Sequence, residues 1–214
     1  NEFRKNKELT RKLKSAKKSK VLLPDKLTSS PKCSPAKREL YAVEGDSAAG
    51  SAKQARDPSF QEVFALRGKF MNAMRSTPNQ LFASDEVISL LQAIGFNPDV
   101  KEPLKHLRVG KILWLADADA DGAHINVLGL TLLYKVLPEM FDAGMVYIVV
   151  GSEFVGKDSK GTLLFADSLE ELKRLNGGKL PADTKQLKGW GAASPTSLRE
   201  MAFSPKTRRL FKVM

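Results

Sequence analysis

The chain has 214 residues, of which 42% are hydrophobic and 28% are charged, and its formal net charge is +11. This composition is typical of a globular protein with one sizeable core or two small ones. No stretch reaches the ~18 apolar residues of a membrane span, and the Lys-rich N-terminus lacks the apolar region of a secretory signal. The single cysteine excludes an internal disulfide framework, so a reducing, cytoplasmic setting is expected. The chain begins with Asn1 rather than Met, which suggests that it is cut from a longer one.

The positive charge is concentrated at the N-terminus. Residues 1–38 hold 13 Lys/Arg and 3 Asp/Glu, whereas the remaining 176 residues hold 22 basic and 21 acidic groups. A basic arm of this kind suits a polyanion, because each phosphate contact releases condensed counterions. A solvated linker helix beside a domain explains the same charge, and the sequence does not decide between the two.

The first half of the chain alternates strands and helices. Residues 3–20 predict an exposed helix with Leu9 and Leu13 on a thin apolar stripe, and the Pro- and Ser-rich residues 24–38 predict a linker. Strands are then expected at 39–43, 62–66, 111–116 and 145–150, and helices at 47–55, 84–95 and 123–143. This order predicts an α/β fold, with a parallel sheet and flanking crossover helices.

The pattern weakens after residue 150. Short strands are expected at 154–155 and 162–165, and helices at 168–175, 195–202 and 205–213. The predicted organisation is therefore a basic helix and linker over 1–38 and an α/β domain over 39–150. A variable insert and a small helical C-terminal tail over 151–214 complete the domain.

Acidic residues follow two of the predicted strands. Asp117, Asp119 and Asp121 alternate with alanines, so in an extended segment their carboxylates point to one side. Like charges at that spacing repel unless a cation lies among them, and hard oxygen ligands select magnesium, manganese or calcium. Glu44, at the end of the first strand, can supply a fourth acid, because ligands bind at the carboxyl ends of parallel strands.

Two other interpretations of the aspartates compete with a magnesium site. The pattern D-x-D-x-D-G opens an EF-hand loop, but that loop ends on a Glu ligand, and the corresponding residue here is Leu128. Acids at a helix N-terminus, which the helix dipole favours, explain Asp121 but not three aspartates in alternation.

The two acidic motifs together resemble the TOPRIM signature, whose fold is Rossmann-like. They are Glu44-Gly45-Asp46-Ser47-Ala48 and Asp117-Ala118-Asp119-Ala120-Asp121-Gly122. The neighbouring sequence is similar to the B subunits of bacterial DNA gyrase and topoisomerase IV, which are type IIA topoisomerases. The similar segments are residues 39–54, 66–72, 121–125, 137–139, 144–148, 187–191 and 205–210, so the resemblance covers roughly 8–150 and 185–214.

The resemblance implies a role for each acid. Glu44 corresponds to the general acid/base and to a magnesium ligand. Asp117 and Asp119 correspond to the main metal ligands, and Asp121 to a ligand that acts through water. The implied cofactor is Mg²⁺, for which Mn²⁺ or Ca²⁺ can substitute.

The resemblance also implies double-stranded DNA as a partner. Lys69 and Asn72 match family positions that touch DNA, and Arg67, Lys53 and His124 are expected near the phosphates, although an ordinary structural hydrogen bond explains His124 equally well. The family cleaves and rejoins both strands through a tyrosine. That tyrosine is expected on a gyrase A-like or topoisomerase IV A-like partner, in an A2B2-type heterotetramer. ATP acts only through a separate ATPase domain that has no counterpart here.

Several residues are expected to be structural. Tyr41, Tyr134 and Tyr147 are interpreted as core residues rather than nucleophiles, because they fall in apolar strands or in the amphipathic helix. Trp190, between two glycines, is interpreted as a core residue rather than a platform for a base.

The chain departs from the family pattern at several positions. These are Ala49, Arg67, Asn126, residues 151–154 and residues 192–193; Asn126 replaces an arginine close to the acidic motif. A bacteriophage or plasmid origin fits this divergence. The departures keep open a non-catalytic DNA-binding or assembly module. A stand-alone nuclease or primase is the other alternative, against which the basic loop at 66–72 and the final segment argue.

Overall fold

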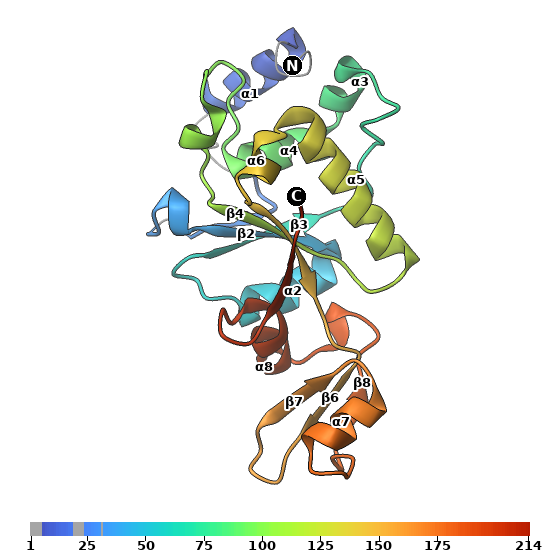
Figure 1. Cartoon of the computed structure of the whole chain (residues 1–214). Coiled ribbons are helices and arrows are strands. Elements are labelled where there is room, and N and C mark those ends of the chain that lie inside the picture. Colours follow the sequence, from blue (N-terminus) through green and yellow to red (C-terminus); the bar gives the residue numbers. More distant parts are fainter. Residues whose placement is uncertain (1–5, 19–23, 31) are drawn as a thin grey trace.

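A computed structural model of the chain describes residues 6–18, 24–30 and 32–214 (Figure 1). Its main body is a six-stranded sheet in the order β1-β3-β2-β4-β5-β9. The bounds of these strands are β1 Leu27–Thr28, β2 Glu39–Glu44, β3 Gln61–Leu66, β4 Lys111–Leu115, β5 Val146–Val150 and β9 Arg209–Lys212. The four central strands β3, β2, β4 and β5 are parallel, and the two edge strands pair antiparallel.

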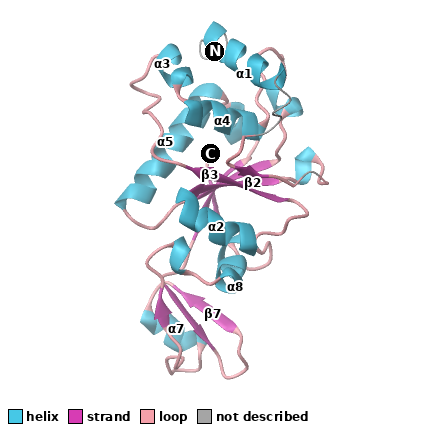
Figure 2. Ribbon diagram, turned by 180° about the vertical axis from the view of Figure 1, so that it is seen from behind, coloured by secondary structure: helices cyan, strands magenta, loops and turns pink. Residues whose placement is uncertain are grey.

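Helices cover both faces of this sheet (Figure 2). One face carries α1 Lys7–Lys18, α3 Pro78–Ala83, α4 Asp85–Ile94, α5 Ala120–Val136 and α6 Glu139–Asp142. The other carries α2 Gly45–Ala55, α8 Pro195–Leu198 and the π-helix η4 Arg199–Phe203. Three short 3₁₀ helices, η1 Pro35–Lys37, η2 Pro103–His106 and η3 Trp190–Ala192, lie in the connections.

The strand sequences explain this two-sided arrangement. Successive side chains of a strand point to opposite faces. In β2, Leu40 and Ala42 therefore join the core under α4 and α5, whereas Tyr41 and Val43 join the core under α2. All four are at most 1% exposed, so β2 is buried on both sides, as a central parallel strand must be.

A small second sheet projects from the far end of β5 (Figure 1). It has the order β7-β6-β8, with β6 Phe154–Lys157, β7 Leu163–Ala166 and β8 Lys185–Gln186, and all its pairs are antiparallel. Helix α7 Leu169–Leu175 packs against β6 and β7. After this sheet the chain returns to the main body through α8 and ends in β9.

The predicted α/β fold with a mostly parallel sheet and flanking helices is confirmed. The helix predicted over 123–143 is instead two helices, because Leu137 leaves the helical conformation immediately before Pro138. The helix predicted over 205–213 is wrong, since that segment forms β9 along the free edge of β5. The predicted linker contains β1 and η1, and α3, which begins with a Thr77–Gln80 capping box, was not predicted.

Two further outcomes concern single features. Tyr41 is buried as predicted, but Tyr134 is 60% exposed on the outer side of α5, so its assignment to the core is wrong. Among the described residues, no helix is long and apolar enough to cross a bilayer. Part of the predicted N-terminal helix lies outside the described residues, which include only 6–18 of that segment.

Candidate metal centre and nucleic-acid interface

The sheet brings Glu44 beside the first aspartate. β2 and β4 are parallel neighbours with Val43 opposite Leu115, so the residues that follow each strand meet at the carboxyl edge of the sheet. The backbone N–H of Asp117 lies close enough to the Glu44 carboxylate to favour its charge and to lower its pKa. Glu44 and Asp117 therefore lie at the same edge of the sheet, whereas the predicted sharing of one site by all four acids stays a prediction.

Glu44 is held in an environment that disfavours its charge. Burial raises the pKa of its carboxyl group, the nearby backbone N–H of Asp117 opposes that rise, and repulsion from Asp117, Asp119 and Asp121 adds to it. Its Oε2 atom is buried and has no hydrogen-bond partner among the described residues. An unpaired buried carboxylate oxygen is costly, so Glu44 lacks a partner that a cation or a proton would supply.

The three aspartates each have a separate contact. Asp117 Oδ1 accepts a hydrogen bond of 2.8 Å from the backbone N–H of Trp190. Asp119 caps α5 by accepting a 2.8 Å bond from the backbone N–H of Gly122. Asp121 pairs with Lys69 at 2.7 Å, and this hydrogen-bonded ammonium lowers the pKa of the exposed Asp121 carboxyl.

These contacts bear on the two competing interpretations. The segment before Asp117 is strand β4 rather than a helix, which is the opposite of an EF-hand. The helix N-terminus interpretation accounts for Asp119 as the cap and for Asp121 in the first turn of α5. It leaves Asp117 and Glu44 unexplained, because neither belongs to that helix.

Close packing fixes the acidic loop. A Cβ atom on Gly122 would lie 2.1 Å from the carbonyl oxygen of Asp117, so only glycine lets α5 start this close to β4. On the other side, Trp190 Nε1 donates to the carbonyl of Ala116 at 2.7 Å. Trp190 is 6% exposed, which confirms its place in the core. Its contact with Asp117 was not predicted, and the Gly-Trp-Gly segment was the only available signal.

The donor set fits a hard divalent cation. All four acids offer oxygen ligands, and the Glu44 carboxylate, which has one unpartnered oxygen, lies in the field of the three aspartates. Over the described ranges, however, no three His, Cys, Asp or Glu side chains are gathered as a ready-made metal cluster. A cation at this edge would therefore need ligands from water or a further molecule besides these side chains.

The residues predicted to contact DNA differ in their position along this edge and in their partners. Arg67 and Lys69 follow β3 on the same edge and pair with Asp46 at 3.2 Å and with Asp121. His124 is exposed in the first turns of α5 and close enough to favour the Asp121 charge. Asn72 uses its side chain to accept from the backbone N–H of Met74 at 2.9 Å in an exposed turn.

Lys53 is the residue that the fold separates from the others. It is exposed in the last turn of α2, eight residues beyond Gly45. At 1.5 Å per helical residue this is about 12 Å from the acidic edge.

A cavity of about 540 Å³ adjoins the acids. It lies between the start of α5, the end of β5 and residues 187–190, and its lining includes Asp117, Asp119 and Asn126. Asn126 Oδ1 is buried with no partner among the residues that the structure describes. Asn126 thus faces the immediate surroundings of the acidic residues.

Comparison with known proteins identifies the class. Residues 39–149 match the Toprim domain family, and this region runs from the start of β2 to the last but one residue of β5 and contains all four acids. The chain therefore belongs to the Toprim domain family.

Its relatives are more specific. The chain is 38% identical over 213 residues to the B subunit of DNA topoisomerase 4 from Haemophilus influenzae, covering 95% of this chain and 34% of that protein. It is 40% identical over 196 residues to the corresponding protein of Pseudomonas aeruginosa (89% and 31%), and 37% identical over 217 residues to that of Bacillus subtilis (98% and 33%). The predicted resemblance to the TOPRIM region of type IIA topoisomerase B subunits is thus confirmed. The chain spans about a third of the length of these relatives.

Proposed function

We propose that this chain is the metal-binding part of the DNA cleavage and religation centre of a type II topoisomerase. In this proposal it holds Mg²⁺ and duplex DNA at the carboxyl edge of the sheet. The single observation that carries the proposal is the meeting of Glu44 with Asp117 at that edge, with one Glu44 oxygen buried and unpartnered. Mn²⁺ or Ca²⁺ meets the same demand for hard oxygen ligands.

Each residue has a role in this proposal. Glu44, Asp117 and Asp119 hold the cation, which when bound supplies a positive charge that stabilises the transferring phosphate. Asp121 acts through water and through Lys69. The raised pKa of Glu44 suits a group that gives a proton to the departing 3′ oxygen and takes it back on religation. Lys69, Arg67, Asn72 and His124 line the approach of the DNA backbone, and Lys53 meets a more distant phosphate.

The attacking tyrosine is proposed to come from a partner subunit. Tyr41 is buried, and its hydroxyl donates to the carbonyl of Ala202 at 2.8 Å. Tyr134 is exposed but lies 14 residues beyond Ala120 on α5, which is about 21 Å along the helix. Tyr147 lies within β5. An A-type subunit in an A2B2 assembly would therefore supply the nucleophile, and a separate domain would supply ATP hydrolysis in the cytoplasm.

A reconstitution tests this proposal. The chain, or its longer parent, is mixed with the cognate tyrosine subunit, supercoiled DNA and magnesium, and covalent cleavage complexes are counted. Glu44→Ala and Asp117→Ala should each lower cleavage by about 10²–10³-fold, as the loss of one charge-stabilising group typically does. Glu170→Ala, which removes an exposed acid on α7, is the matched control and should leave cleavage unchanged.

The same experiment separates the alternatives. Cleavage that survives both Glu44→Ala and Asp117→Ala would replace the catalytic role with a DNA-binding or assembly module, for which the unpartnered Asn126 is the supporting observation. Cleavage by the chain without the tyrosine subunit would favour a stand-alone nuclease.

A further inference from the structure

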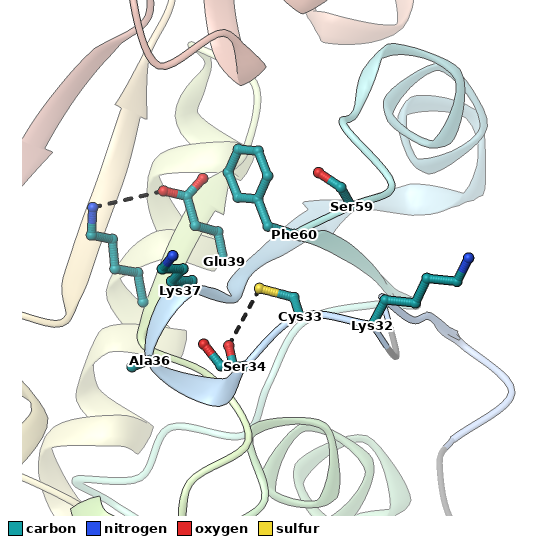
Figure 3. A pocket seen from close by; sticks show the side chains of 9 residues that line it. Lys32, Cys33, Ser34, Ala36, Lys37, Glu39, Ser59 and Phe60 are labelled. Carbon is teal, nitrogen blue, oxygen red and sulfur yellow. Dashed lines mark hydrogen bonds and ion pairs between the residues drawn. The ribbon is translucent and has the colours of Figure 1, made fainter.

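A basic groove lies at the end of the sheet opposite the acidic edge. Figure 3 shows the side chains that line this groove. Its volume is about 710 Å³, and it opens at the amino-terminal ends of β2, β3 and β4. Its lining includes Lys32, Cys33, Lys37, Glu39, Phe60 and Lys111. β2 runs from Glu39 in this groove to Glu44 at the acidic edge, and five residues at ~3.3 Å each separate the two by about 17 Å.

The lysines of this groove are available for an external anion. Lys32 and Lys37 are exposed and make no ion pair with any residue that the structure describes, and in Figure 3 they appear on either side of Cys33. Lys111 stands 3.7 Å from Glu39 with 42% of its side chain exposed. Glu39 is already neutralised by Arg208, whose two guanidinium nitrogens donate to its two oxygens at 2.5 and 2.6 Å. The groove therefore presents a net positive charge.

The segment that carries two of these lysines is fixed to the sheet. Arg38 donates to the carbonyl of Cys33 at 2.5 Å, and η1 holds Lys37 through a 3.1 Å bond from its N–H to the carbonyl of Ser34. A Cβ atom on Gly110 would lie 2.1 Å from the carbonyl of Ala36, so the segment lies directly against the start of β4. Binding there would not have to order this segment first.

We propose that this groove binds the phosphodiester backbone of a duplex DNA segment, at a place separate from the acidic edge. Lysines act as point charges that bind phosphates without reading sequence, and an open groove with exposed ammonium groups suits a long polyanion better than a small enclosed anion. The choice of DNA among polyanions rests on the proposed function.

The first test measures the salt dependence of duplex binding by the full chain, with a chelator present and no tyrosine subunit. The variant Lys32→Glu/Lys37→Glu reverses two groove charges. Lys160→Glu/Lys179→Glu makes the same change in charge on exposed lysines of the small second sheet and its turns. Each phosphate contact contributes about 0.9 to the slope of log K against log salt, so the groove variant should lower the slope by about 2 and the control by about 0.

The second test uses Cys33 as the only cysteine of the chain. It is partly exposed within the groove, so the rate of its alkylation reports occupancy at this place. Duplex DNA should slow alkylation several-fold in the wild type, and Lys32→Glu/Lys37→Glu should remove that protection. Inorganic phosphate at the same phosphate concentration should not protect.

Each contrary result overturns the proposal. An unchanged slope, or alkylation that duplex DNA does not slow, means that DNA does not occupy the groove. Protection by inorganic phosphate alone means a small-anion site, and protection by heparin but not by DNA means a different polyanion. These measurements need neither magnesium nor cleavage. A failure of the groove proposal can therefore be distinguished from a failure of the proposed function.

Discussion

The two ends of β2 carry the same residue type in opposite environments. Glu39, at the amino end, is 5% exposed, and Arg208 and Gln61 satisfy its oxygens. Glu44, at the carboxyl end, faces three aspartates with one oxygen unpartnered. Burial opposes ionisation of both residues. At Glu39 the hydrogen bonds and charge of Arg208 outweigh the effect of burial and lower the pKa. At Glu44 burial and the repulsion from the aspartates outweigh the contact with Asp117 and raise the pKa.

The two glutamates differ in whether another part of the chain satisfies their charge. Arg208 comes from the segment just before β9, 169 residues beyond Glu39, so this pair joins the C-terminal tail to the first central strand. Glu44 has no such partner within the described chain. We expect the amino end, whose charges are satisfied internally, to contribute to stability, and the carboxyl end, which has an unpartnered buried oxygen, to belong to the proposed binding site.

The largest expected effect is at the satisfied end. Arg208→Ala leaves the buried Glu39 charge uncompensated and should lower the free energy of unfolding by about 3–5 kcal/mol. Arg209→Ala is the comparison variant, because the neighbouring Arg209 has exposed partners, Asp167, Ser152 and the carbonyl of Gly151, and its loss should cost less than the loss of Arg208. Urea denaturation of both variants checks this. Equal losses would mean that the Glu39 pair is not what joins the tail to the sheet.

The second prediction concerns packing at the acidic end. Gly122→Ala places a methyl group against the Asp117 carbonyl, so the loop or the helix must shift. We expect a loss of about 1–3 kcal/mol in unfolding free energy, as for other overpacked sites. Gly50→Ala is the control, because nothing lies within 4 Å of its Cβ position inside α2. That substitution should instead stabilise the chain by about 0.5–1 kcal/mol. Equal stability of the two variants in thermal unfolding would show that the close approach at Gly122 is not required.

Sequence alone predicted what depends on local pattern. The short, continuous apolar runs of β2 and β4 predicted both strands, and the acids that follow these runs predicted a shared edge of the sheet. The helix predicted over 205–213 was wrong because its real partner is β5, about 60 residues earlier, and local propensity does not report such pairing. The Trp190 contact with Asp117 joins residues 73 apart and was missed for the same reason.

The third prediction is a pH dependence at the satisfied end. Burial opposes the charge of Glu39, but Arg208, Gln61 and Lys111 outweigh it and hold the pKa below the ordinary value of 4.5. A group with a lowered folded pKa stabilises the protein above its unfolded pKa, and this stabilisation is lost as the pH falls through the folded value. Glu39→Gln should therefore be less stable than the wild type at pH 7, and the gap should narrow below about pH 4.5. Chemical denaturation at several pH values checks this. If the difference in unfolding free energy between Glu39→Gln and the wild type did not change with pH, the destabilisation would come from altered packing and not from the lost charge.

The smallest expected effect has the opposite sign and lies at the unsatisfied end. With a chelator present, Glu44→Gln removes one negative charge from the neighbourhood of three aspartates, and it keeps the shape of the side chain. The variant should gain on the order of 0.5–1 kcal/mol in unfolding free energy and should lose DNA cleavage in the reconstituted enzyme. This trade-off is expected where activity requires a charge that destabilises the fold. Glu170→Gln, on the exposed side of α7, should leave both properties unchanged. If Glu44→Gln destabilised the metal-free chain, the Glu44 carboxylate would have to be satisfied by its surroundings after all. The two ends of β2 would then not differ in the way that their contacts indicate.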